Sequence, residues 1–100
     1  MFIITEHIKV VEVPQNHTIL IGMPVKIECK FSGTPTPIIS WYQIKSDGKR
    51  VPVTNGVYPI PGGSQLQIVT ALPNNAGLYV CAANNGVETV EKSAYLLLEG

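Results

Sequence analysis

The sequence has 100 residues and no net formal charge, because seven basic and seven acidic side chains cancel, and 45% of its residues are hydrophobic. This length is enough for one domain with a buried core, and the composition excludes a disordered chain. The charge balance excludes the basic surface that binding to nucleic acid or to an anionic membrane requires. The longest apolar runs are much too short to span a bilayer, so we expect no transmembrane helix and no direct membrane insertion.

Residues 1–100 are interpreted as a single domain that comes from a longer multidomain protein. Glu6 and His7 follow only a few apolar residues, and no small-residue cleavage site comes after them, so we expect no signal peptide. Targeting information is therefore expected outside this sequence.

Clusters of Gly, Pro, Asn and Asp divide the chain into short runs rich in Val, Ile, Leu and Tyr, a pattern typical of an antiparallel all-β domain. Pro14 interrupts the first run, since proline donates no hydrogen bond to a strand ladder. The Asp47-Gly48 turn predicts a hairpin, because glycine adopts the positive φ that such a turn needs. Residues 54–58 are expected to be irregular. The expected strands are residues 8–13, 17–21, 25–31, 38–44, 50–53, 65–69, 78–84 and 90–98.

Two of the expected strands, 25–31 and 65–69, alternate between apolar and polar residues, which is the pattern of a strand with one buried face. The apolar side, which includes Leu66, is expected to face the core. The polar side is an ordinary water-facing surface. Its members are Lys26, Glu28, Lys30, Gln65 and Gln67.

The two cysteines and the lone tryptophan lie on the apolar sides of three different expected strands. Trp41 follows Cys29 by twelve residues, Cys81 follows Cys29 by fifty-two, and Tyr79 precedes Cys81 by two. These spacings match the immunoglobulin pattern of two cysteines around a buried tryptophan, with a tyrosine corner before the second cysteine.

Further motifs extend this resemblance over essentially the whole chain. GTPTP at 33–37, LQI at 66–68, NAGLYVC at 75–81 and the alanine and asparagine at 83 and 85 resemble the intermediate set, or I-set, of the immunoglobulin superfamily. This set occurs in adhesion molecules, receptor tyrosine kinases and titin-like muscle proteins. The resemblance implies a two-sheet antiparallel immunoglobulin-like β-sandwich. It also implies that Cys29 and Cys81 form the inter-sheet disulfide, with Trp41, Tyr79 and Leu66 in the core.

Two positions depart from the family pattern. The usual acid before the tyrosine corner is Asn75, which cannot form an ion pair, so the family's salt bridge from this position is not expected. Glu88 replaces the glycine that normally follows Asn85 by three residues, which leaves the geometry of the last hairpin open.

The sequence predicts no catalysis, no metal site and no cofactor. Two cysteines without a nearby histidine or a third cysteine cannot close a zinc site, and the CxxC spacing is missing. Whether the cysteines are oxidised depends on the cellular compartment. His7 and His17 lie in the first strand region and the only aspartate is Asp47, in a turn, so no nucleophile, base and orienting group are expected together.

Asn16, in Asn16-His17-Thr18, is a candidate N-glycosylation site and would fit a secreted glycoprotein. Chance also produces such a triplet in a chain with this content of asparagine, serine and threonine. The motif therefore does not by itself decide the compartment.

The outward side of the second sheet is expected to be apolar, in contrast to the first. Alternation places one set of large and small apolar residues there, and a contiguous patch of this kind typically marks an interaction site. Cover by a neighbouring domain, or ordinary scattered exposure, are the alternatives. The expected protein-binding residues are Tyr42, Ile44, Leu78, Val80, Ala82, Tyr95 and Leu97.

The predicted function is a non-catalytic protein–protein interaction module of a cell-surface adhesion molecule or receptor, located outside the cell. Its partner is expected to be another protein, in homophilic or heterophilic contact, or a neighbouring domain of the same chain. The alternative is an intracellular titin-like or actin-associated muscle domain of the sarcomere or cytoskeleton, acting as a structural spacer or scaffold.

Overall fold

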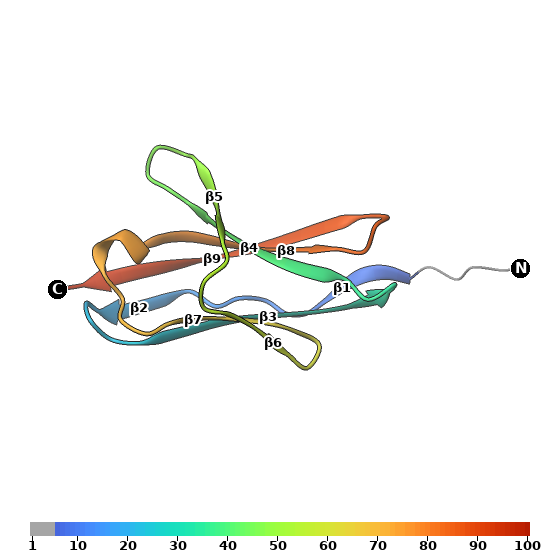
Figure 1. Ribbon diagram of the computed structural model, residues 1–100, viewed down its shortest axis with the longest axis horizontal. Coiled ribbons are helices and arrows are strands. Elements are labelled where there is room, and N and C mark those ends of the chain that lie inside the picture. Colours follow the sequence, from blue (N-terminus) through green and yellow to red (C-terminus); the bar gives the residue numbers. More distant parts are fainter. Residues whose placement is uncertain (1–5) are drawn as a thin grey trace, which may run out of the picture.

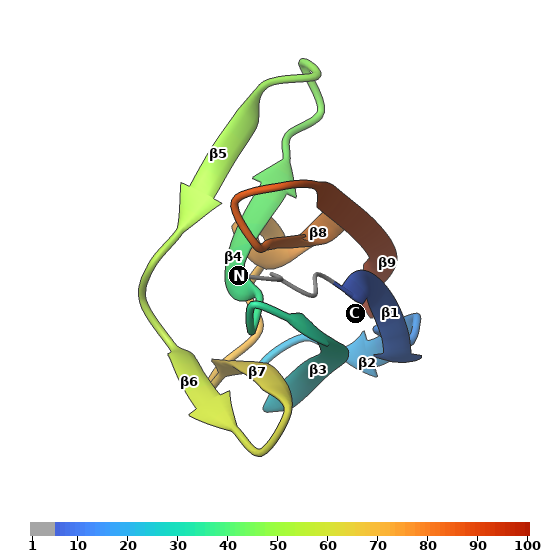
Figure 2. The same ribbon diagram turned by 90° about the vertical axis from the view of Figure 1, so that its right-hand side faces the viewer.

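A computed structural model describes residues 6–100, which form a sandwich of two β-sheets (Figures 1 and 2). Residues 1–5, part of the segment in which a signal peptide was considered, lie outside the described residues. The strands are β1 (Glu6–Glu12), β2 (His17–Leu20), β3 (Val25–Thr34), β4 (Ile38–Ile44), β5 (Arg50–Val53), β6 (Val57–Ile60), β7 (Gly63–Ile68), β8 (Gly77–Asn84) and β9 (Thr89–Glu99). A short 3₁₀ turn at Pro73–Asn75 precedes β8.

The four-stranded sheet has the order β1-β3-β7-β6, and all of its pairs are antiparallel. The five-stranded sheet has the order β2-β9-β8-β4-β5, and only its β2–β9 pair is parallel among the described strands. The chain changes sheet five times, first between β1 and β2, where Pro14 lies, then at β2–β3, β3–β4, β5–β6 and β7–β8. The β5–β6 connection runs down one side of the sandwich in Figure 2. The fold is the immunoglobulin-like sandwich that the sequence pattern predicts.

The core lies between the two sheets and contains the motif residues. Cys29 in β3 is joined to Cys81 in β8 by a disulfide. Trp41 is buried, and its indole N–H donates to the Ser64 hydroxyl on the opposite sheet at 2.8 Å. Leu66 is fully buried beside this pair of cross-sheet links. The two layers are thereby held in one relative position.

Tyr79 is buried at the start of β8, and its hydroxyl donates to the backbone carbonyl of Asn75 four residues upstream. Burial raises the pKa of Tyr79 to about 12, although the hydrogen bond to Asn75 acts in the opposite direction. The Asn75 side chain accepts the backbone N–H of Leu72 at 2.8 Å. A neutral asparagine therefore closes this turn through a backbone contact.

One segment differs from the sequence-based expectation. Residues 57–60, the end of the stretch expected to be irregular and its continuation, form β6 at the edge of the four-stranded sheet. Pro59 is tolerated because an edge strand has one side without a ladder partner. The expected hairpin at Asp47-Gly48 is present, with Gly48 at a φ of 84°.

Candidate functional site

The candidate site is the outer face of the five-stranded sheet, which we define as the side of this sheet turned away from the core. Three cross-strand rows build it from β4, β8 and β9. Ile44, Leu78 and Tyr95 form one row, and Tyr42, Val80 and Ser93 form the next. The third row contains Ser40, Ala82 and Glu91.

The seven sequence-predicted binding residues share this face but differ in exposure. Val80 and Ala82 keep only 7% and 8% of their surface exposed, whereas Tyr95 and Leu97 are each 52% exposed. Tyr42, Ile44 and Leu78 are half-buried. The expectation of an open apolar patch at the centre of the face is therefore wrong for Val80 and Ala82.

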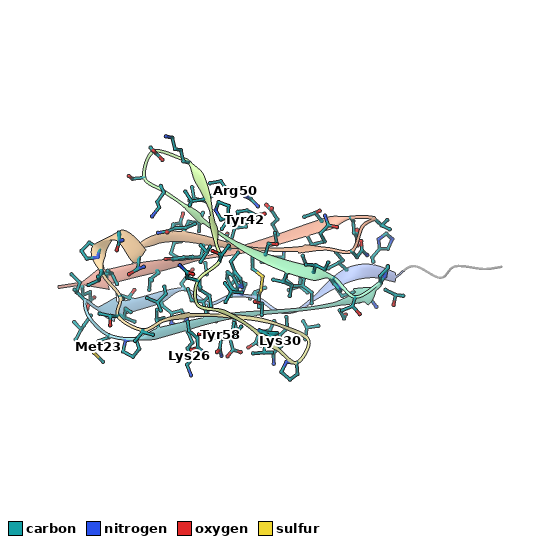
Figure 3. The ribbon with its side chains drawn as sticks, in the orientation of Figure 1. Met23, Lys26, Lys30, Tyr42, Arg50 and Tyr58 are labelled. Carbon is teal, nitrogen blue, oxygen red and sulfur yellow. A yellow bond between two sulfur atoms is a disulfide. The ribbon has the colours of Figure 1, made fainter. Side chains whose placement is uncertain are left out.

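The centre of the face is covered by a charged pair that spans four strands. Arg50 in β5 extends over the Tyr42 ring in β4, with its guanidinium carbon 4.1 Å from the ring centroid, as Figure 3 shows for these two residues. Its two terminal nitrogens donate to the two carboxylate oxygens of Glu91 in β9, one of them at 3.2 Å. Cation–π contact and a bidentate ion pair thus act on the same guanidinium.

The electrostatics of this pair follow from its geometry. The hydrogen bond to Glu91 raises the pKa of Arg50, and the hydrogen bond from Arg50 lowers the pKa of Glu91. Both groups stay charged at neutral pH. We call Tyr42, Arg50 and Glu91 the strap, because together they cross the outer face from β5 to β9 over β8, the strand that carries Val80 and Ala82.

The strap divides the outer face into two parts. Toward the β8–β9 hairpin, a hollow of about 710 Å³ is lined by both polar and apolar side chains, including Ser40, Glu91 and the exposed Ile38. Toward the C-terminal end of β9, apolar side chains predominate up to Leu97, beside which lie the exposed Thr18 of β2 and, further along β9, the exposed Glu99. We call this second part the apolar strip, and its members are Ile44, Leu78, Tyr95 and Leu97.

Asn16 lies at the edge of the apolar strip. It is exposed, and its Oδ1 accepts the backbone N–H of Tyr95 at 2.9 Å. The sequon asparagine is thus held in place beside the free edge of β9, immediately before β2.

The β8–β9 hairpin, whose geometry the sequence left open, is organised by two side chains. The buried Asn85 accepts the backbone N–H groups of Val87 and Glu88, both at 2.9 Å. Glu88 accepts the backbone N–H of Ile8 in β1 and lies 3.3 Å from His7 Nδ1. The bond from Ile8 is the main cause of the lowered pKa of Glu88. The residue that replaces the usual glycine therefore ties the hairpin to the first strand.

Neither a metal site nor a membrane-crossing helix is found in residues 6–100. The described side chains contain no group of three or more His, Cys, Asp or Glu residues that could hold a metal ion. No helix within the same residues is long and apolar enough to cross a membrane.

The sequence resembles that of several much longer proteins. It is 39% identical over 79 residues to Hemicentin-2 of Mus musculus, covering 79% of this chain and 2% of that protein. It is 34% identical to the Peroxidasin homolog and 32% identical to Vascular endothelial growth factor receptor 1, both of Homo sapiens. These matches cover 86% and 85% of this chain but 6% of each relative. The similarity therefore concerns one small part of each relative.

Solved structures show the same fold. Titin domain M7 superposes with a TM-score of 0.83 at 25% identity, covering 99% of this chain and all of that chain. The titin Ig tandem A164-A165 gives 0.79 at 27% identity, over 98% of this chain and 50% of that chain. The titin domains Z1Z2 in complex with telethonin give 0.82 at 26% identity, over 96% of this chain and 48% of that chain.

The family model for the immunoglobulin I-set domain matches residues 8–98, which is nearly the whole chain. Its residues include both cysteines, the buried tryptophan and the tyrosine corner described above. The chain therefore belongs to the immunoglobulin I-set domain family.

Proposed function

We propose that this domain is a non-catalytic protein-binding module of a receptor or adhesion protein, and that the apolar strip is its binding surface. The observation that carries the proposal is the half-exposed pair Tyr95 and Leu97 on β9, with Tyr95 aligned across the strands with Leu78 and Ile44. Tyrosine is enriched at protein interfaces, because it offers a large rigid surface with a polar tip. The partner is a protein, in homophilic or heterophilic contact.

The proposed absence of catalysis is supported by where the titratable side chains lie. His7 is beside Glu88, near the end of β4 that starts at Ile38. Asp47 lies in the turn that follows the other end of β4, where its carboxylate accepts the Lys49 backbone N–H. A histidine and an aspartate at opposite ends of a strand cannot act together as base and orienting group.

We place the protein at the cell surface or outside the cell. A receptor among the similar proteins supports this location, and Cys29 and Cys81 are placed to form the kind of disulfide that persists in oxidising compartments. The exposed Asn16 would be glycosylated there. A sugar on Asn16 would lie at the edge of the apolar strip and limit how a partner approaches Tyr95.

A photo-crosslinking experiment in the full-length protein tests the binding surface. A p-benzoylphenylalanine is introduced in place of Tyr95 or, as a matched control, in place of Tyr58. These tyrosines are 52% and 51% exposed and lie on opposite outer faces. Irradiation in cells should give covalent adducts with another protein from position 95 and none from position 58. Equal adducts from both positions, or none from position 95, would contradict the proposal.

The second candidate function is a structural spacer in an intracellular titin-like protein. The superposition on titin M7 over the whole of both chains favours it. The oxidation state of the cysteines distinguishes the two settings. Alkylation and mass spectrometry of the protein from its native source should find Cys29 and Cys81 blocked in a disulfide if the module is extracellular. Free thiols at both positions would support the spacer.

A further inference from the structure

The tripeptide Asn-Gly-Val occurs twice in the chain, at residues 55–57 and at residues 85–87. An asparagine that precedes a glycine is prone to deamidation, because glycine has no side chain to hinder attack of its backbone nitrogen on the asparagine side chain. The two sites share this local sequence and therefore have nearly the same intrinsic reactivity. A difference between them in the folded protein has to come from their surroundings.

The hairpin between β8 and β9 restrains Asn85. This residue is buried, and its Oδ1 accepts the backbone N–H groups of Val87 and Glu88. The backbone N–H of Gly86, whose nitrogen would attack, donates to Asn84 Oδ1 at 2.7 Å. Asn85 Nδ2, the nitrogen that would leave, is shielded from water. The nucleophile is thus engaged elsewhere, and the leaving group lies away from the water that would carry it off as ammonia.

Asn55 has the opposite surroundings. It is exposed in the connection between β5 and β6, which runs along one side of the sandwich in Figure 2. Within residues 6–100, no hydrogen bond holds the Asn55 side chain, and the Gly56 N–H donates to no backbone carbonyl. Both residues line a surface hollow of about 440 Å³, so water reaches them. The Gly56 nitrogen and the Asn55 amide are therefore free to react with each other.

We propose that Asn55 is a site of spontaneous deamidation in the folded protein, and that the fold protects Asn85 from the same reaction. The proposal does not depend on the proposed binding surface. It rests on the contrast between two identical tripeptides, one with a solvent-exposed asparagine and an unbonded glycine N–H, the other with both groups restrained.

The reaction needs only water. The Gly56 nitrogen forms a bond to Asn55 Cγ, the bond between Cγ and Nδ2 breaks, and the displaced amide group takes the proton of the Gly56 nitrogen and leaves as ammonia. Water then opens the resulting succinimide ring. Attack at Cγ gives aspartate, whereas attack at the main-chain carbonyl carbon gives isoaspartate, in which the backbone runs through the former side chain. The net reaction consumes water and releases ammonia, and nothing is oxidised or reduced.

The isoaspartate product would disturb the pairing of β6 with β7. The Gly56 carbonyl accepts the Gln67 N–H at 2.8 Å, and the backbones are so close that a Cβ on Gly56 would overlap the Gln67 carbonyl oxygen. Isoaspartate inserts an extra methylene group into the backbone immediately before this contact, which would displace Gly56. Aspartate leaves the backbone length unchanged and would preserve the contact. The structural effect of deamidation therefore depends on which product forms.

The two asparagines can be compared within one peptide. Trypsin cuts after Arg50 and Lys92, so residues 51–92 contain both sites, and fragment-ion masses report the conversion at each site in the same sample. The folded chain is incubated in mildly alkaline buffer, which favours deprotonation of the attacking nitrogen. Deamidation at Asn55 should be at least about tenfold faster than at Asn85, because Asn85 reacts only when the hairpin opens locally.

Unfolding supplies the matched control. In guanidinium chloride, with the disulfide reduced, both asparagines should react at rates within about twofold of each other, because the unfolded chain offers them similar surroundings. Equal rates in the folded chain, or a faster reaction at Asn85, would overturn the proposal. So would a folded chain in which Asn55 stays intact over the time that the unfolded chain needs to react at both sites.

Hydrogen exchange tests the structural consequence. In the isoaspartate form, separated by chromatography, the Gln67 amide should exchange faster than in the unmodified chain, because it loses its bond to Gly56. The variant Asn55→Asp, which carries the same added charge on a backbone of normal length, should keep the protection of the Gln67 amide. Unchanged protection in the isoaspartate form, or equal loss in both, would overturn the predicted effect on β6.

Discussion

The two outer faces of the sandwich carry equally exposed tyrosines in opposite surroundings. On the four-stranded sheet, Tyr58 is aligned with Gln65 and Glu28, which are hydrogen-bonded to each other at 2.7 Å. On the five-stranded sheet, Tyr95 is aligned with Leu78 and Ile44. Figure 3 shows Tyr58 with Lys26 and Lys30 on one side of the molecule, and Tyr42 with Arg50 on the other.

The exposure of one aromatic side chain therefore says little about function. The neighbours of Tyr58 satisfy one another, since Gln67 also donates to Gln65. These polar side chains are therefore hydrogen-bonded without a binding partner. The cross-strand neighbours of Tyr95 toward the centre of the sheet, Leu78 and Ile44, have no polar side-chain groups, so a protein that covers them loses no side-chain hydrogen bond to water.

Removing the disulfide between Cys29 and Cys81 should destabilise the whole sandwich, and so both of its outer faces. The double variant Cys29→Ala with Cys81→Ala should lower the free energy of unfolding by about 2–5 kcal/mol, because the disulfide closes a long loop of the unfolded chain and joins the two sheets. Urea denaturation with and without the substitutions measures this loss. A change below about 1 kcal/mol would show that Trp41 and the remaining core hold the sheets without it.

Central positions on the two outer faces should respond differently to the same substitution. Val80→Glu should lower the free energy of unfolding by about 1.5–3 kcal/mol, because a nearly buried valine is replaced by a charge beneath the strap. Lys26→Glu, on the exposed outer face of β3, should change it by less than about 0.5 kcal/mol. Denaturant titration of both variants measures the contrast. Equal effects would mean that Val80 is open to water.

Removing the strap's cation with Arg50→Ala should have the smallest effect on stability, and that effect should depend on pH. The pKa of Glu91 is lowered in the folded protein, mainly by Arg50, so the ion pair stabilises the fold above the ordinary carboxyl pKa of 4.5. This contribution is lost as the pH falls through the lowered folded-state pKa. Arg50→Ala should therefore lower the thermal midpoint more at neutral pH than at about pH 3.

Part of the Arg50→Ala difference should persist at low pH, because the contact with the Tyr42 ring does not require an ionised carboxylate. NMR titration should show the pKa of Glu91 rising in the variant. The pKa of Glu88, which is lowered mainly by the Ile8 backbone, serves as an internal control and should not move. An unchanged pKa for Glu91 would show that the pair does not form in solution.

The sequence was sufficient to predict the family, the two-sheet sandwich and which side of most strands faces the core. Alternation assigns a side chain to one side of a sheet, and the cysteine and tryptophan spacing assigns the inward side. Alternation does not show whether an outward-facing side chain is buried by side chains from other strands. Val80 points outward but is buried, because Arg50 and Glu91, 41 residues apart in sequence, meet across two intervening strands.

Two further features needed three-dimensional information. Residues 54–58 were expected to be irregular, but residues 57 and 58 belong to β6, which accommodates Pro59 because it lies at a sheet edge, and edge position is a property of the whole sheet. The loop after β2 and the segment after β7 are almost 50 residues apart in sequence, but backbone hydrogen bonds join Gly22 and Met23 to Ala71. Turn residues predicted both loops but not that they lie side by side.

The most direct test of the central claim is the affinity of the protein captured at position 95 for two alanine variants of this domain. Tyr95→Ala should raise the dissociation constant at least about tenfold, because an interface aromatic is lost, and Tyr58→Ala should change it less than about twofold. Both variants should unfold at the wild-type midpoint. Equal weakening by the two substitutions, or none by Tyr95→Ala, would contradict the assignment of the apolar strip as the binding surface.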